Sequence, residues 1–236
     1  MRRPPAGRRV MKRSDLALRE APDLSTFRRV PRASFAGTVY REHADRLGDD
    51  RGCWWYSSTP GGGEPEGRFD LEEPADDREQ RRGTLYVAEP PAASARERCG
   101  RFLAARAPIP ETLVVGRVVS SIVGEASDLG DLTHQDAALI GVTGEIHSVN
   151  DYRLTATWAA AADALGLAGL KYLPRFTPGG EVAHALFGPA GPTAPEGFLI
   201  VGVRTLAEVL VEMGAHPRAI PQQADVVDDE AEIDEL

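Results

Sequence analysis

One strand–helix unit limits the possible folds of this chain more than any other stretch. Gly83–Ala88 reads GTLYVA and is typical of a short buried strand, which Glu89-Pro90-Pro91 ends. The residues that follow, Ala92–Ala107, predict a helix. A strand that ends beside the start of a helix forms a pocket corner, where backbone N–H groups are free to meet an anion. We therefore expect the floor of an active site here, with Tyr86 on the strand and Glu97 on the helix.

The size and charge of the chain exclude several classes of function. Its 236 residues, 42% of them hydrophobic, suffice for one sizeable domain with a real core. The net charge of −9 and the pI near 5.1 argue against nucleic acid as the main ligand, because binding phosphates needs a basic face. Two cysteines are too few for a disulfide framework or a zinc site, and the histidines have no metal-ligand spacing, so we expect no metal.

The two ends of the chain differ from its middle. Residues 1–30 are rich in Arg and predict a basic disordered tail, within which Met11 is an alternative start to Met1. Residues 216–236 predict an acidic disordered tail, which leaves 31–215 as the folded domain. No apolar run is long enough to span a bilayer, and the charged N-terminal stretch lacks the apolar segment of a secretory signal. We therefore expect a cytoplasmic protein without membrane contact.

Strand and helix patterns follow one another irregularly in the middle of the chain and indicate an α+β fold. Strands are expected at Thr38–Arg41, Cys53–Ser58, Val118–Val123, Gly169–Leu173, Ala183–Gly188 and, as an edge strand, Phe198–Val203. Helices are expected at Asp151–Leu165 and Arg204–Met213, and a turn at Asp128–Leu132 leads to a short helix at Thr133–Leu139.

Several candidate side chains have an ordinary structural interpretation beside the functional one. Glu97 is either a site carboxylate or half of a surface pair with Arg101, four residues along the helix. Trp54 and Trp55 either fill a core or form a stacking wall beside the glycine-rich loop that follows them. Arg41 ends a strand and gains a functional role only if it points into the same pocket as Glu97.

A series of short motifs follows a fixed order over about residues 36–190. The series consists of Tyr40-Arg41, Trp54-Trp55-Tyr56-Ser57-Ser58, Gly67-Arg68-Phe69-Asp70, Gly83-Thr84-Leu85-Tyr86-Val87-Ala88, Glu97, Thr155-Ala156-Thr157-Trp158-Ala159, Gly169-Leu170-Lys171-Tyr172 with Arg175, and Ala185-Leu186-Phe187-Gly188. In this order and spacing the chain resembles the RES domain, the toxin component of bacterial RES–Xre toxin–antitoxin pairs. In particular, Glu97 falls eleven residues after Tyr86, as the family pattern requires.

The resemblance implies a fold similar to that of ADP-ribosyltransferases, with a split antiparallel β-sheet core and flanking helices. It implies NAD⁺ as a substrate rather than a cofactor, and cleavage of its nicotinamide–ribose bond with transfer of ADP-ribose to phosphate, water or a protein. It also implies an Xre-like antitoxin as a partner and leaves room for a homo-oligomer.

Site residues follow from the same resemblance. It implies catalytic roles for Glu97, Arg41 and Tyr86. The substrate-binding residues that it implies are Arg68, Tyr40, Trp55, Ser57, Tyr172 and Arg175.

The chemistry of NAD⁺ agrees with these roles. The nicotinamide nitrogen is already cationic and leaves as a neutral ring, so one carboxylate suffices where ordinary glycoside hydrolysis uses two. Glu97 fits that carboxylate. An Arg is needed to hold the pyrophosphate, and we expect Arg41 first and Arg68 second. The ring of Tyr86 can stack on the nicotinamide and position it.

One position departs from the family. Many members have Ser immediately before the Arg that corresponds to Arg175, whereas this chain has Pro174, which offers neither a hydroxyl nor a backbone N–H. Ser57, Ser58 or a backbone group are the substitutes that the sequence offers. The departure keeps two alternatives open: a catalytically weakened domain that binds a nucleotide or a protein, and a protein mono-ADP-ribosyltransferase.

Overall fold

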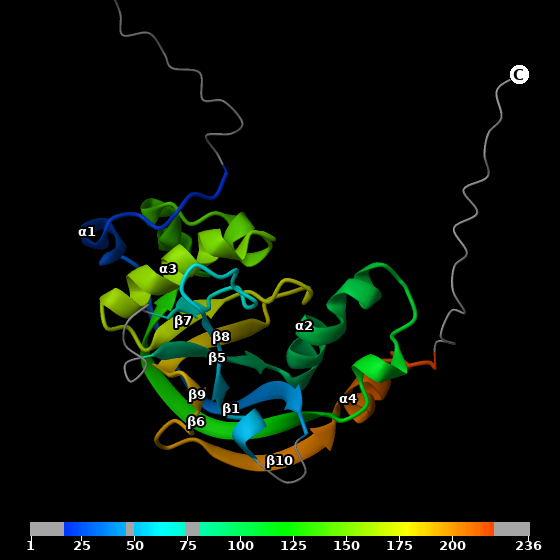
Figure 1. Cartoon of the computed structure of the whole chain (residues 1–236). Helices are drawn as coiled ribbons and strands as arrows, with labels where there is room; N and C mark the ends of the chain where they lie inside the picture. The colour runs from blue at the N-terminus through cyan, green and yellow to red at the C-terminus, as the bar shows by residue number, and fades with distance from the viewer. Residues whose placement is uncertain (1–16, 46–49, 74–80, 220–236) are drawn as a thin grey trace, which may run out of the picture.

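A six-stranded sheet with the strand order β1-β5-β8-β7-β6-β10 organises the chain (Figure 1). The computed structural model describes residues 17–45, 50–73 and 81–219. The strands of this sheet are β1 (Arg32–Ala44), β5 (Arg82–Glu89), β6 (Arg117–Asp131), β7 (Gly169–Tyr172), β8 (Val182–Pro189) and β10 (Leu199–Thr205). Two short pairs accompany it, β2 (Trp55–Tyr56) with β9 (Gly191–Pro192) and β3 (Ser58–Thr59) with β4 (Leu71–Glu72).

Strand β1 pairs along both of its edges and closes the sheet into a ring. One edge pairs with β6 from Arg32↔Gly130 to Ala44↔Arg117, whereas the other meets β5 at Tyr40↔Ala88. Strands β1, β5, β8, β7 and β6 therefore form a closed circuit, to which β10 adds an edge beside β6. Within this sheet only the β6–β7 pairing is parallel. The α+β class and the split antiparallel sheet with flanking helices are thus confirmed.

The end of β6 differs from the prediction. The segment Asp128–Leu132 was expected to be a turn, but β6 continues to Asp131 and pairs with β7 up to Asp131↔Lys171. Its Asp and Gly content favours a turn, and the two neighbouring strands override that local preference. The short helix expected at Thr133–Leu139 is a 3₁₀-helix over Gln135–Ile140.

Helices cover the ring from two directions (Figure 1). The α-helices are α1 (Leu24–Phe27), α2 (Pro91–Ala104), α3 (Tyr152–Ala164) and α4 (Leu206–Glu212), and further 3₁₀-helices lie at Asp50–Gly52, Glu111–Leu113 and Gly144–His147. Helix α3 contacts β4 and β7, whereas α2 contacts β1, β5 and α4. The pocket corner predicted from the sequence therefore lies on the α2 side, away from α3.

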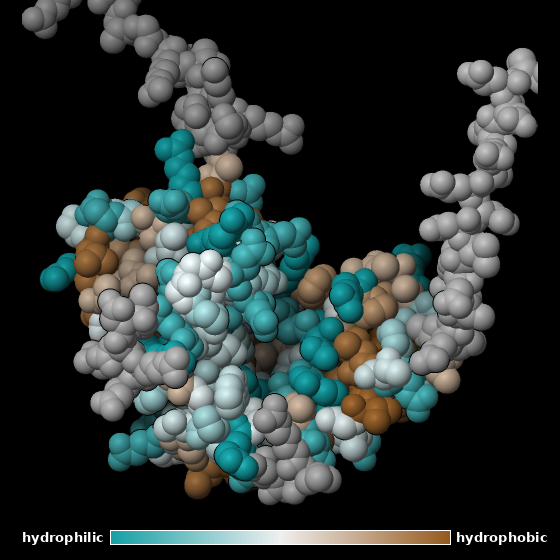
Figure 2. Space-filling view, viewed as in Figure 1, coloured by the Kyte–Doolittle hydropathy of each residue, from teal (hydrophilic) through white to brown (hydrophobic). Residues whose placement is uncertain are grey.

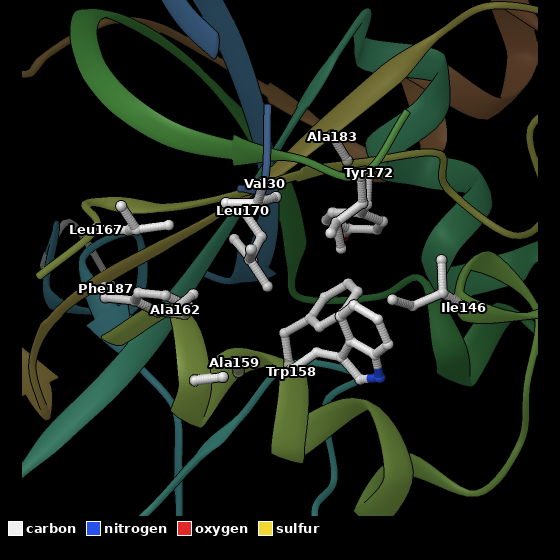
Figure 3. Packing of buried hydrophobic residues seen from close by; sticks show 14 of the residues in the cluster. Val30, Ile146, Trp158, Ala159, Ala162, Leu167, Leu170, Tyr172, Ala183 and Phe187 are labelled. Carbon is white, nitrogen blue, oxygen red and sulfur yellow. The ribbon is translucent and has the colours of Figure 1, made fainter. Parts of the chain in front are cut away.

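The largest core lies between α3 and the strands β7 and β8 and is centred on Trp158 (Figure 3). The ring of Trp158 lies 5.9 Å from that of Phe27, and its Nε1–H donates a hydrogen bond of 2.9 Å to the carbonyl of Arg19. Residues 17–30 are therefore part of the fold, and the prediction of a basic disordered tail is wrong for them. Residues 1–16 lie outside the described residues.

A second core fills the inside of the ring. Its strand members are Val39, Leu85, Val87, Ile122, Leu129 and Leu186. Trp54 is buried against it, as the core interpretation predicts, but Trp55 is 47% exposed. Trp54 lies in the turn before β2, whereas Trp55 begins β2 and points away from Tyr56, the buried residue of that strand.

The C-terminal region is folded as far as Arg218. The Arg218 N–H donates to the carbonyl of Ile109 at 2.9 Å, and the Glu111 N–H donates to the carbonyl of Arg218 at 3.0 Å. The prediction of an acidic disordered tail is therefore wrong for residues 216–219, and residues 220–236 lie outside the described residues.

Cys53 and Cys99 are free, buried thiols. Burial raises the pKa of each thiol to about 11, so neither is a thiolate at neutral pH. Among the described residues, no group of three or more His, Cys, Asp or Glu side chains is arranged to hold a metal ion. In the same part of the chain, no helix is long and apolar enough to cross a membrane.

A close contact on α2 gives a test of this packing. A Cβ atom built at Gly100 would lie 2.1 Å from Cγ of Phe176, so Gly100→Ala must displace Phe176 and the segment that carries it. We expect Gly100→Ala to lower the free energy of unfolding by about 1–3 kcal/mol in urea titrations, in spite of the better helix propensity of Ala. Gly144→Ala is the control, because its Cβ would meet open space. An unchanged or increased stability of Gly100→Ala would contradict the packing of Phe176 on α2.

Candidate active site

The corner between β5 and α2 has less backbone hydrogen-bonding capacity than its sequence suggested. Pro90 is the N-cap of α2 and Pro91 its first residue, so neither position supplies an N–H group. The N–H of Ala93 donates to the carbonyl of Pro90 at 3.0 Å. The helix also begins one residue earlier and ends three residues earlier than expected. An anion at this corner must therefore be bound mainly by side chains.

A cavity of about 240 Å³ opens beside α2, between β1, β5 and the ends of β7 and β8. On this face the surface is hollowed next to α2, and hydrophilic side chains surround the hollow (Figure 2). Of the predicted site residues, the cavity is lined by Tyr40, Arg41, Tyr86, Glu97 and Tyr172. Three further polar residues of the lining, Glu42, Ser94 and Arg98, were not predicted as site residues.

Glu97 presents its carboxylate to this cavity from α2. The N–H of Phe176 lies 3.5 Å from Oε1 of Glu97. The Glu97 side chain is exposed, but the protein packed beside its carboxylate still raises its pKa, and the Phe176 N–H with the charges of Arg68 and Arg175 opposes that rise. Among the described residues Glu97 forms no ion pair with Arg101, whose guanidinium lies over the Phe102 ring instead. The surface-pair interpretation of Glu97 is therefore wrong.

Arg41 uses its guanidinium to hold the wall of the cavity together. Its Nη1 donates to the carbonyl of Tyr86 at 3.0 Å, and its Nη2 donates to the carbonyl of Trp55 at 2.8 Å. Its buried Nε has no hydrogen-bond partner among the described residues. Arg41 thus connects β1 to β5 and to β2, and it adds a half-buried positive charge to the wall of the cavity.

Tyr86 is fixed by the Gly67–Asp70 loop. Its hydroxyl donates to Oδ1 of Asp70 at 2.8 Å and accepts a hydrogen bond of 2.7 Å from the N–H of Phe69. The Gly67 N–H donates to Oδ2 of Asp70 at 2.7 Å, so both oxygens of this buried carboxylate are satisfied. Burial and the neighbouring Asp70 raise the pKa of Tyr86 well above 10, so the phenol stays neutral. Asp70 lay in a motif that the sequence analysis quoted, but its role required the folded loop.

Arg68 lies behind the cavity instead of lining it. It is 5% exposed, donates to the carbonyl of Val149 at 3.0 Å and lies over the Tyr152 ring at 5.2 Å. Its charge still lowers the pKa of Glu97. Tyr172, whose ring does line the cavity, is buried next to Phe69, with ring centroids 5.0 Å apart.

Three other predicted residues lie outside the cavity lining. Trp55 pairs with Pro192 of β9, and its carbonyl is the acceptor for Arg41. Ser57 forms an isolated bridge with Thr84. Arg175 donates to Oδ1 of Asn150 and lies 5.1 Å over the Phe176 ring. Their proposed contacts with substrate stay predictions.

The net charge of the cavity depends on which of its charged side chains already form ion pairs within the protein. Arg117 binds both carboxylate oxygens of Glu42, with a distance of 2.8 Å from Nη2 to Oε2. Arg98 forms no ion pair or hydrogen bond with another described residue. The cavity therefore combines the carboxylate of Glu97 with one uncommitted guanidinium. The four-residue spacing of Ser94 and Arg98 was visible in the sequence, but nothing local indicated that this face of the helix lines a cavity.

Comparison with known proteins identifies the family. The model of the RES domain family matches residues 38–222, so the chain belongs to the RES domain family. Among solved structures, a chain of the M. tuberculosis MbcT–MbcA toxin–antitoxin complex is similar, with a TM-score of 0.56 and 16% sequence identity. The alignment covers 80% of this chain and 94% of that chain. At this identity the likeness shows the fold alone. No curated protein sequence matches the chain.

The raised pKa of Glu97 predicts a pH-dependent stability. The folded state disfavours the ionised carboxylate, so stability falls as the pH rises from the ordinary value of 4.5 through the raised folded pKa. Glu97→Gln removes the ionisation, and we expect this variant to have a slightly higher Tm than the wild type at neutral pH, because solvent screens most of the effect at an exposed side chain. The two Tm values should converge below pH 4.5, where both side chains are neutral. A Glu97→Gln variant with a lower Tm at neutral pH would contradict the unfavourable ionisation.

Proposed function

We propose that the chain is an enzyme that cleaves the nicotinamide–ribose bond of NAD⁺ in the cavity beside α2 and acts as the toxin of a toxin–antitoxin pair. The observation that carries this proposal is the position of Glu97, whose carboxylate faces a cavity lined by tyrosine rings and two arginines. Membership of the RES domain family supports it.

The proposed reaction needs one carboxylate and no acid. The bond between C1′ of the ribose and the nicotinamide nitrogen breaks, and its electron pair neutralises the pyridinium ring. Positive charge grows on the ribose, where the Glu97 carboxylate stabilises it. An oxygen of water or phosphate then bonds to C1′, and with water a proton is released. The raised pKa of Glu97 makes its carboxylate more basic than a free one, which suits a hydrogen bond to a ribose hydroxyl.

Fixed aromatic rings support the binding of nicotinamide. The Tyr86 hydroxyl is bound to Asp70 and to the Phe69 N–H, so the ring has one orientation before any ligand arrives. A ring held in this way can stack on a planar ligand without the cost of ordering its own side chain at binding. Tyr40 and Tyr172 line the same cavity.

The segment around Pro174 supports catalysis without a hydroxyl at that position. Phe176, two residues later, packs against Gly100 and brings its N–H to 3.5 Å from Glu97. A backbone donor near the carboxylate was one of the substitutes that the sequence offered for the missing serine.

A partner protein completes the proposal. The similar structure from M. tuberculosis is a complex of a toxin with its antitoxin. We propose an Xre-like antitoxin for this chain and action in the cytoplasm, where NAD⁺ is available.

A second candidate is a domain that binds the nucleotide without cleaving it. Two observations favour it: Pro174 has no hydroxyl, and the Arg41 guanidinium already donates to the carbonyls of Tyr86 and Trp55. This candidate predicts saturable binding of ADP-ribose without release of nicotinamide.

Nicotinamide release from NAD⁺ by the purified protein, measured with and without phosphate, tests the function. We expect wild-type protein to release nicotinamide and Glu97→Gln to lower kcat by about 100-fold or more, because the charge that stabilises the ribose cation is lost. Glu125→Gln on the exposed face of β6 is the matched control and should leave the rate unchanged. Phosphate dependence would separate phosphorolysis from hydrolysis.

Two results would contradict the proposal. Wild-type protein that leaves NAD⁺ intact, while Pro174→Ser consumes it, would exclude an active native enzyme. Equal rates for the wild type and Glu97→Gln would exclude Glu97 as the essential carboxylate. Retention of the ADP-ribose on a macromolecule would instead identify a protein as the acceptor.

A further inference from the structure

We propose that Ser94 and Arg98 form a phosphate-binding subsite on the cavity face of α2. The proposal rests on the proposed function and deepens it, because it identifies where the site binds a phosphate group. That group is either part of the NAD⁺ pyrophosphate or free inorganic phosphate that accepts the ADP-ribose.

Ser94 carries the first observation. The residue is 7% exposed and lines the cavity, yet its hydroxyl forms no hydrogen bond with any described residue. The buried hydroxyls of Thr84 and Thr155, by contrast, donate to the carbonyl of Phe69, at 2.7 Å, and to the carbonyl of Arg68. Because Ser94 lines the cavity, its hydroxyl is available to a ligand there.

Arg98 carries the second observation. It lies four residues after Ser94, so both side chains leave the same face of α2, and both line the cavity. The neighbouring arginines are occupied: Arg96 pairs with Glu181 at 3.0 Å, and Arg101 lies over the Phe102 ring. Arg98 has no such contact within the described part of the chain. A free guanidinium beside a free hydroxyl matches the acceptor oxygens of a phosphate.

Apart from the carboxylate of Glu97, the surrounding charges favour an anion at this position. Glu42 is neutralised by Arg117, and the half-buried Arg41 adds positive charge in the cavity wall. Ser94 is the fourth residue of α2, at the end of the first turn, over which the helix dipole favours negative charge. Pro90 and Pro91 have no N–H groups with which this end of the helix could bind an anion, so side chains are needed to bind it.

The subsite changes which residue we expect to bind the pyrophosphate of NAD⁺. Sequence reasoning placed Arg41 in that role, but Arg41 donates to the carbonyls of Tyr86 and Trp55. Arg98 can engage a ligand without breaking a bond within the protein.

The test compares Arg98→Ala and Ser94→Ala with Arg101→Ala, a control on the same helix that lies outside the cavity lining. Initial rates of nicotinamide release are measured against NAD⁺ at fixed phosphate and against inorganic phosphate at fixed NAD⁺. Arg98→Ala should raise one of the two KM values by about 10-fold or more, as loss of a charged hydrogen bond predicts. Ser94→Ala should raise the same KM about 3- to 10-fold, and Arg101→Ala should stay within about 2-fold of wild type.

The two KM values distinguish the sources of the phosphate. A higher KM for NAD⁺ alone identifies its pyrophosphate as the ligand, whereas a higher KM for inorganic phosphate alone identifies the acceptor. Either result supports the subsite. Unchanged KM values in both Arg98→Ala and Ser94→Ala would overturn it while leaving the proposed function intact.

Binding measurements keep the test independent of turnover. Isothermal titration of the full-length wild type and of each variant uses ADP-ribose in one arm and inorganic phosphate in the other. If the wild type does not cleave NAD⁺, the proposed function fails, but weaker binding of either ligand by Arg98→Ala still supports the subsite. Equal binding by wild type and Arg98→Ala, or no binding of either ligand, overturns the subsite. Thermal melts confirm that each variant is folded.

Discussion

The double pairing of β1 is the constraint on which the rest of the structure depends. Along one edge β1 pairs with β6 over almost its whole length, and along the other it meets β5 at Tyr40↔Ala88. The sheet closes at this point and separates beyond it, which leaves room for the cavity next to α2. Arg41, one residue further along β1, secures the junction through the carbonyls of Tyr86 and Trp55. The same residue pair that closes the ring therefore lies at the wall of the candidate active site.

Buried polar contacts set the shape of that wall before a ligand binds. Asp70 holds the Tyr86 hydroxyl, and the hydroxyls of Thr84 and Thr155 bind the carbonyls of Phe69 and Arg68. The loop that carries Asp70 is thus fastened to β5 and to α3, and the cavity side of Tyr86 has little freedom to move. Such preorganisation suits a reaction in which the protein positions a substrate and stabilises a developing charge instead of transferring protons.

Much of the central unit could be predicted from the sequence, because its signals are local. The β-branched and aromatic run at Gly83–Ala88, the proline break and the helix after it fix the strand, the corner and the position of Glu97. Signals that depend on distant partners were missed. The composition of Asp128–Asp131 predicts a turn, but the segment is a strand because it pairs with β7. Residues 17–30 have the composition of a disordered tail, but they are folded because Phe27 packs against Trp158. The roles of Arg41, Asp70, Ser94 and Arg98 depend on which groups the closed ring leaves unpaired, and no local pattern encodes that.

The central claim is that the cavity beside α2 binds NAD⁺ with its reactive ribose at Glu97. A crystal structure of the Glu97→Gln variant soaked with NAD⁺ tests it most directly, because this variant should bind the substrate without consuming it. The account predicts the ribose next to residue 97, the nicotinamide against the Tyr86 ring and a phosphate group within hydrogen-bond distance of Ser94 and Arg98. NAD⁺ bound in another part of the molecule, or an empty cavity at a saturating concentration of NAD⁺, would contradict it.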